Sequence, residues 1–174
     1  MKATRNGKVR LRSHGCCCRK YIGLVIMMTA KFATPQEVAE YVCRQLEGKV
    51  IIHRYDAYST NSIYLKFDYG VAKSLRISDH PGKKHLAYRY NIDFARKHYA
   101  VKYSPQGYPR YYYPVSAVDR VIKDILDAKR AKEYRYKDYA GLLEAVMARS
   151  EHEKGFWQQA RLIHDVGKKG EGNE

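Results

Sequence analysis

The spacing of apolar side chains changes twice along the chain, and these two changes limit the fold to the α+β class. Residues 34–47 carry apolar side chains at helical spacing, residues 49–113 alternate apolar and polar side chains, and a period near 3.6 returns from residue 116. A helix, then several short strands, then more helices is typical of α+β proteins. We therefore expect one antiparallel sheet with helices on one of its faces.

The first helix has a clear start signal. Thr34 is placed to cap it, Pro35 occupies the first helical position, and Glu37 follows three residues after the cap. Gly48 is placed to end the helix. The apolar stripe that follows the cap is Val38, Tyr41, Val42 and Leu46.

Alternation predicts four to six strands between residues 49 and 113, in the segments 49–55, 62–70, 72–78, 87–92, 99–103 and 110–115. Gly70, the Pro81-Gly82 pair and the Pro105–Gly107 segment supply turns between them. Because these connections are short, we expect a largely antiparallel meander. In the segment 87–92, alternation directs Tyr88, Tyr90 and Ile92 to the core and the residues between them to solvent.

Three helices are expected after the sheet. The first begins with Ser116 as cap and runs to about residue 132, and its apolar stripe fits the buried face of the sheet. The second spans about 138–149. A third, shorter helix is expected over about 156–165.

The remaining segments have the composition of appendages. Residues 1–28 hold seven Lys/Arg and no acid, and they end in an apolar run. This leader is either a basic disordered arm or the result of a start codon assigned too early. A secretory signal is the weaker alternative, because the apolar run is short. We expect a single domain over residues 29–166 and a disordered tail over 167–174.

The charge of the chain suits a polyanionic partner. The net charge is +15, and without the leader it is still +8. An antiparallel sheet usually leaves one face open to solvent. Alternation assigns to that face a set of basic and hydroxyl side chains from four strands: Tyr64, Lys66, Ser74, Arg76, Ser78, Arg89 and Lys102.

The turn after residue 78 adds polar residues at the edge of this face: Asp79, His80, Lys83, Lys84 and His85. One interpretation is a site that binds the phosphates of a nucleic acid, with tyrosines available to stack on unpaired bases. Another is a divalent metal site of Asp79, His80 and His85, with Asp93 or His98 as further ligands, although the spacing matches no defined metal motif. A plain polar turn is the third. His164-Asp165 imitates one step of an HD phosphohydrolase motif, but the downstream Asp of that motif is missing.

Residues 64–92, "YLKFDYGVAKSLRISDHPGKKHLAYRYNI", resemble phage-encoded anti-CRISPR proteins of the type II-A, Cas9-inhibiting group. In that family a strand ends in Arg-Leu-Ser-Asn-His or a close variant, and a polar turn, another strand and a long amphipathic helix follow. The matching residues here are 76–80, then Lys84-His85 and the segment 87–92. The resemblance covers about residues 50–130, and it implies a site at residues 76–80 with the neighbouring basic residues.

Two partner classes follow from these observations. The resemblance implies a Cas9-type effector protein or its guide RNA, and the basic face suggests DNA or RNA bound directly. A small metal-dependent nuclease using Asp79, His80 and His85 is the enzymatic alternative, whereas the binding hypotheses require no cofactor. The cysteines match neither a disulfide framework nor a zinc motif, which favours the cytoplasm, and no segment is long and apolar enough to predict a membrane span.

Overall fold

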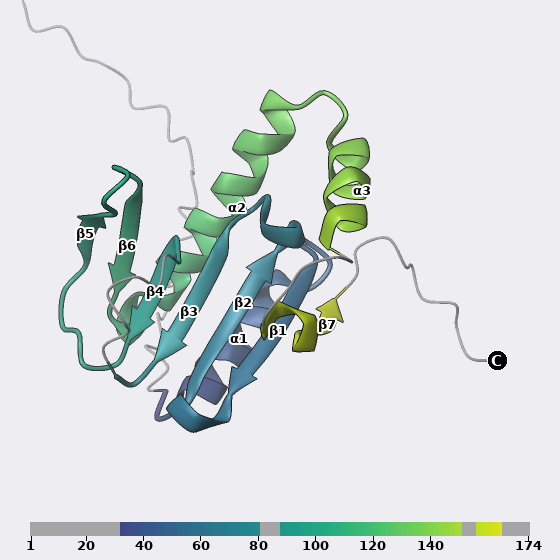
Figure 1. Ribbon diagram of the computed structural model, residues 1–174. Coiled ribbons are helices and arrows are strands. Elements are labelled where there is room, and N and C mark those ends of the chain that lie inside the picture. Colours follow the sequence, from purple (N-terminus) through teal and green to yellow (C-terminus); the bar gives the residue numbers. More distant parts are fainter. Residues whose placement is uncertain (1–31, 81–87, 151–155, 165–174) are drawn as a thin grey trace, which may run out of the picture.

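A computed structural model describes residues 32–80, 88–150 and 156–164, and its architecture is α+β, as the sequence predicts (Figure 1). The elements in chain order are α1 (Pro35–Leu46), β1 (Ile52–Ala57), β2 (Ser62–Phe67), β3 (Ser74–Ser78), β4 (Tyr90–Asp93), β5 (Ala100–Tyr103), β6 (Pro109–Tyr113), α2 (Val118–Arg135), α3 (Tyr139–Ser150) and β7 (Arg161–His164). The predicted leader and tail lie outside the described residues.

The sheet is mixed rather than an antiparallel meander. Its strand order is β5-β6-β4-β3-β2-β1-β7, and the β3–β4 and β4–β6 pairs are parallel. The prediction was wrong because the Pro81-Gly82 pair suggested a tight hairpin turn. Strands β3 and β4 run in the same direction, so the connection between them is not a hairpin, and residues 81–87 of that connection lie outside the described residues.

Helices α1 and α2 cover one face of the sheet (Figure 1). Their apolar side chains form one core cluster with residues of β1 to β4 and β6. The expected cap of α1 is present, because the Glu37 N–H donates to Thr34 Oγ1 at 3.3 Å. The Glu37 carboxylate reaches back to the Ala33 N–H at 2.8 Å. The first bond satisfies a backbone donor that the first helical turn leaves open, and the second ties the residue before the cap to the helix.

The later helices differ in part from expectation. A short 3₁₀ turn (Val115–Ala117) precedes α2, which begins at Val118 with Ala117 as its cap residue and with no side-chain bond, so Ser116 is not the cap. Helix α3 agrees with the prediction. It packs against the turn between β2 and β3 rather than against the sheet face.

The helix expected over residues 156–165 is absent from the described part of that segment. Residues Phe156–Gln159 form a 3₁₀ turn, and β7 then pairs with the outer edge of β1. Pairing with an open strand edge has overridden the local helical pattern. His164 therefore lies in a strand, unlike the helical His of an HD motif. Among the described helices, none combines the length and apolar character needed to cross a bilayer.

Candidate anion-binding site

Strand register brings the predicted polar residues of β2 and β3 to the sheet face opposite the helices, which we call the open face. Lys66 pairs with Ser74, and Tyr64 pairs with Arg76. Their neighbours along each strand, such as Leu65, belong to the core on the other side. On the far edge, Lys102 pairs with Arg110 and is exposed. The open face therefore combines residues from strands that are distant in sequence.

Two of these predicted contact residues are not available to a partner. Arg76 is 4% exposed, and Ser78 is fully buried. Arg76 Nη2 donates to the His80 carbonyl oxygen at 3.1 Å, and Ser62 Oγ donates to Ser78 Oγ at 3.0 Å. Alternation predicted that Arg76 and Ser78 lie on the open face. It cannot reveal that both side chains already form hydrogen bonds within the protein.

His80 and Asp79 also have structural partners. His80 Nε2 lies 2.8 Å from the Thr60 carbonyl oxygen. A carbonyl can only accept, so Nε2 carries the proton and cannot act there as a base or a metal ligand. Asp79 accepts a hydrogen bond from the Asn61 amide at 3.0 Å. These bonds join the end of β3 to the turn between β1 and β2.

The other proposed ligands do not complete a metal site. Asp93 accepts the Ala95 N–H at 3.0 Å, and His98 is exposed. Within residues 32–80, 88–150 and 156–164, no group of three His, Cys, Asp or Glu side chains could hold a metal ion. His85, Lys83 and Lys84 lie outside the described residues.

The segment before β4 departs from the alternation that the sequence suggests. Tyr88 was expected in the core, but its ring packs on Tyr64 of the open face, with ring centroids 4.9 Å apart. Arg89 was expected on the open face, but its guanidinium lies 4.7 Å from the ring centroid of Tyr111, on the helix side. Arg89 Nη1 also donates to the Pro109 carbonyl oxygen at 2.8 Å. Because β4 begins only at Tyr90, strand alternation does not fix the face on which the side chains of Tyr88 and Arg89 lie.

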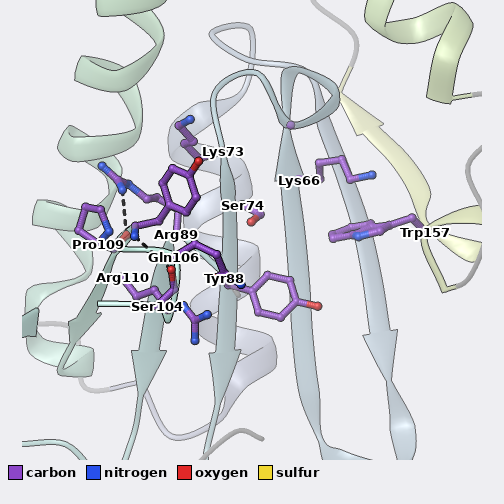
Figure 2. Close-up of a pocket in the computed structure, with 12 residues that line it drawn as sticks. Lys66, Lys73, Ser74, Tyr88, Arg89, Ser104, Gln106, Pro109, Arg110 and Trp157 are labelled. Carbon is purple, nitrogen blue, oxygen red and sulfur yellow. Dashed lines mark hydrogen bonds between the residues drawn. The ribbon is translucent and has the colours of Figure 1, made fainter. Parts of the chain in front are cut away.

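A pocket of about 510 Å³ opens beside these residues, at the end of the sheet where the three parallel strands begin (Figure 2). Figure 2 shows Lys66 and Trp157 on one side, Ser74 and Tyr88 between, and the remaining basic residues on the other side. The lining residues are Lys66, Gly70, Lys73, Ser74, Tyr88, Arg89, Ser104, Gln106, Tyr108, Pro109, Arg110 and Trp157. The described lining thus contains four cations and three aromatic rings, and it contains no carboxylate.

Lys73 of the pocket lies near other positive charges. Burial lowers the pKa of Lys73 below its ordinary value, and the positive charges of Lys132 and Arg89 lower it further. Arg89 Nε is buried and has no hydrogen-bond partner among the described residues. A bound anion would relieve the repulsion at Lys73.

The turn that carries Lys73 into the pocket has an unusual backbone. Asp68, Tyr69, Gly70 and Lys73 all have positive φ, with values of 47°, 53°, 94° and 81°. Only glycine adopts this region without cost, so three of the four positions store strain. Strained backbone of this kind concentrates at functional sites, although it does not by itself identify one.

Asp68 holds this turn in place. The residue is fully buried, and its Oδ1 accepts the Ile51 N–H at 2.8 Å. Its Oδ2 accepts the Tyr139 hydroxyl of α3 at 2.7 Å and lies 3.7 Å from Lys129 Nζ of α2. Burial and this bond raise the pKa of Tyr139 well above its ordinary value. One carboxylate therefore fastens both C-terminal helices to the strained turn.

Trp157 forms the outer wall of the pocket. Lys66 Nζ lies 4.2 Å from the centroid of the Trp157 ring, which is a cation–π geometry. Only 8% of Lys66 is exposed. Trp157 reaches this position because β7 pairs with β1 and brings the preceding 3₁₀ turn beside β2. Lys66, Ser74 and Arg89 are the predicted residues that line the pocket.

Sequence reasoning missed the other basic residues of the pocket and its tryptophan. Arg110 could have been found, because it sits opposite Lys102 once the two strands are aligned as a hairpin. Lys73 gave no signal, since nothing in the sequence marks its left-handed backbone. Trp157 was assigned to a helix. Comparison with known proteins adds no further assignment: no family model matches the chain, and no curated protein or solved structure shows significant similarity to it.

Proposed function

We propose that the protein binds single-stranded nucleic acid at the open face, with the 510 Å³ pocket as the centre of the site. The observation that carries this proposal is the lining of the pocket, which combines four cations with three aromatic rings. Cationic side chains attract phosphates, and aromatic faces stack on unpaired bases. The high net charge of +15 supports the same class of partner.

An unpaired strand suits the site better than a duplex. The basic residues are recessed, since Lys66 is 8% and Arg110 9% exposed. The bases of a duplex are stacked on each other and cannot reach the rings of Trp157 or Tyr108. A flexible single strand can place one nucleotide inside a recess while its neighbours lie on the open face.

The tryptophan provides a direct assay. Trp157 is the only tryptophan of the chain, and it lines the pocket, so its fluorescence reports on occupancy. We expect a short oligonucleotide to quench this fluorescence and binding to weaken steeply with salt. The variants Lys73→Ala and Arg110→Ala should each reduce the slope of log affinity against log salt by about 0.7, the value for one lost contact to a single strand.

Lys123→Ala is the matched control. Lys123 is exposed on α2, on the opposite side of the sheet, and its loss changes the net charge of the protein by the same amount. If Lys73→Ala and Lys123→Ala weaken binding equally, general charge attraction explains the affinity and the pocket is not the site. Absence of binding at low salt would contradict the proposal as a whole.

A more specific form of this function is inhibition of a Cas9-type nuclease in the cytoplasm of a bacterial host. The resemblance of residues 64–92 to Cas9-inhibiting anti-CRISPR proteins supports it, as does the match between a cationic pocket and a guide RNA. Arg76 and Ser78 could not make the contact, since they are buried, so within residues 76–80 only Asp79 and His80 reach the surface. In a Cas9 cleavage assay we expect the wild-type protein to block cutting and Lys73→Ala to block it less. Full cutting at excess wild-type protein would refute Cas9 inhibition but would not contradict the binding of single-stranded nucleic acid.

A further inference from the structure

Strand β5 forms one edge of the sheet. It stands first in the strand order β5-β6-β4-β3-β2-β1-β7, and no strand of the described residues lies outside it (Figure 1). An edge strand presents backbone N–H and C=O groups that the sheet does not use. Such an edge can accept one further extended segment of polypeptide.

The register shows which backbone groups of β5 point away from the sheet. Val101 pairs with Tyr111 of β6, and the Tyr111 N–H donates at 2.8 Å to the Arg89 carbonyl oxygen, on the side of β4. Tyr103 pairs with Pro109, which has no N–H to donate. Both are therefore non-hydrogen-bonded pairs, in which the residue of the edge strand directs its backbone groups outward. The N–H and C=O groups of Val101 and Tyr103 form the open edge.

The side chains of β5 fit a peptide of one pattern. Val101 and Tyr103 are 39% and 71% exposed, and they lie on the helix side, because Val101 pairs with Tyr111, which packs against the core. Lys102, between them, is exposed on the open face. A strand added to β5 would place alternate side chains on these two sides of the sheet. Apolar side chains would lie beside Val101 and Tyr103, and a carboxylate would lie beside Lys102.

The charge around this edge selects an acidic partner. Residues 94–113 carry four Lys/Arg and no Asp or Glu. Lys97 is exposed, and so is Arg120 of α2, whose guanidinium lies 4.2 Å from the ring centroid of Tyr99. A second copy of this chain suits the edge poorly, because it would bring Lys102 close to its own counterpart. A nucleic acid matches the charge but has no backbone that alternates N–H and C=O groups.

We propose that β5 binds an extended segment of a partner protein by strand addition, and that apolar residues alternate with carboxylates in this segment. The inference goes beyond the proposed function, since none of the four residues of β5 lines the pocket. Loss of nucleic-acid binding therefore leaves it untouched, and its own failure leaves the pocket untouched.

Strand addition can be tested with a labelled synthetic peptide of about ten residues that alternates valine and glutamate. Fluorescence anisotropy of the label reports binding to the full chain. One comparison peptide has an N-methylated backbone, which cannot donate hydrogen bonds, and another has lysine in place of glutamate. We expect the protein to bind the first peptide and neither of the comparison peptides.

Two substitutions on β5 test the backbone and the charge separately. Val101→Pro removes an outward N–H but no bond to β6, and proline is tolerated on edge strands, so binding should weaken about two- to tenfold. Lys102→Glu should weaken binding at least about twofold and allow the valine–lysine peptide to bind. Lys137→Glu, at an exposed position between α2 and α3, is the matched control and should bind like wild type. Lys102→Glu keeps the test decisive if the proline variant does not fold.

Four results would overturn the inference. The first is equal binding of the N-methylated peptide, and the second is equal affinity of Lys102→Glu and wild type. The third is a dimer in sedimentation that Val101→Pro dissociates, without peptide binding, which would assign the edge to a second copy. The fourth is an oligonucleotide that binds more weakly to Lys102→Glu than to Lys137→Glu while no peptide binds, which would assign the edge to nucleic acid.

Discussion

Replacing Lys73 with glycine should weaken the proposed ligand binding while leaving the fold as stable as before, or more so. Lys73 has a φ of 81°, and the positive charges of Lys132 and Arg89 act on its side chain. Both features work against the folded state. Loss of this residue therefore separates stability from function, which few binding-site substitutions do.

The magnitude follows from three contributions. A side chain in the left-handed region costs about 1–2 kcal/mol, which glycine recovers. Glycine in turn loses about 0.5–1 kcal/mol through the greater freedom of its unfolded chain. Removal of the like-charge repulsion adds roughly a few tenths of a kcal/mol, because solvent screens a partly exposed group. The net change in the free energy of unfolding is a gain of about 0–2 kcal/mol.

Urea unfolding of wild type, Lys73→Gly and Lys73→Ala measures these contributions. Alanine removes the charge but keeps the strain, so the glycine variant should be the more stable of the two. Oligonucleotide titration should show that both have lost affinity to a similar extent. A glycine variant less stable than wild type by more than about 1 kcal/mol would refute the assigned strain. Unchanged affinity in both variants would refute the role of Lys73 in binding.

Three further predictions concern stability. Asp68→Ala should lower the free energy of unfolding by about 3–5 kcal/mol in urea, since it removes two charge-assisted bonds, from the Ile51 N–H and the Tyr139 hydroxyl; a loss under about 1 kcal/mol would show that the turn does not depend on it. Burial raises the pKa of Tyr90 to about 12, above the value near 10 expected when unfolded, so stability is full below pH 10 and falls as pH rises to 12. The variant Tyr90→Phe should make that decline shallower, which unfolding at several alkaline pH values would check. Thr34→Ala should cost about 1 kcal/mol in thermal or urea unfolding through loss of the helix cap, and no change would argue against that bond.

Local chemistry explains which elements the sequence could predict. The cap at Thr34 and the alternation in β2 and β3 are properties of neighbouring residues, so α1 and the two strands were found close to their true bounds. The direction of β4 and the position of β7 depend on pairing between distant segments. Since no local pattern encodes such pairing, the parallel pairing of β3, β4 and β6 and the edge strand β7 were missed.

The candidate site was predicted only in part for the same reason. Alternation places Lys66 and Ser74 on the open face, and both line the pocket. It cannot distinguish them from Arg76, which lies on the same face but is buried and hydrogen-bonded to the His80 carbonyl oxygen. Trp157 enters the pocket through tertiary pairing, and Lys73 enters through a backbone conformation that non-glycine residues seldom adopt.

The pairing of β1 with β7 has a consequence for the growing chain. During synthesis β1 emerges early, but its outer neighbour cannot form until Arg161–His164 has been made. At roughly 5–20 residues per second, the ribosome needs on the order of 5–20 s to cover the stretch between them. For that time the edge of β1 offers unpaired backbone groups to any other nascent chain. A truncation before β7 would make this exposure permanent, so the shortened protein should self-associate as well as lose the tryptophan wall of its pocket.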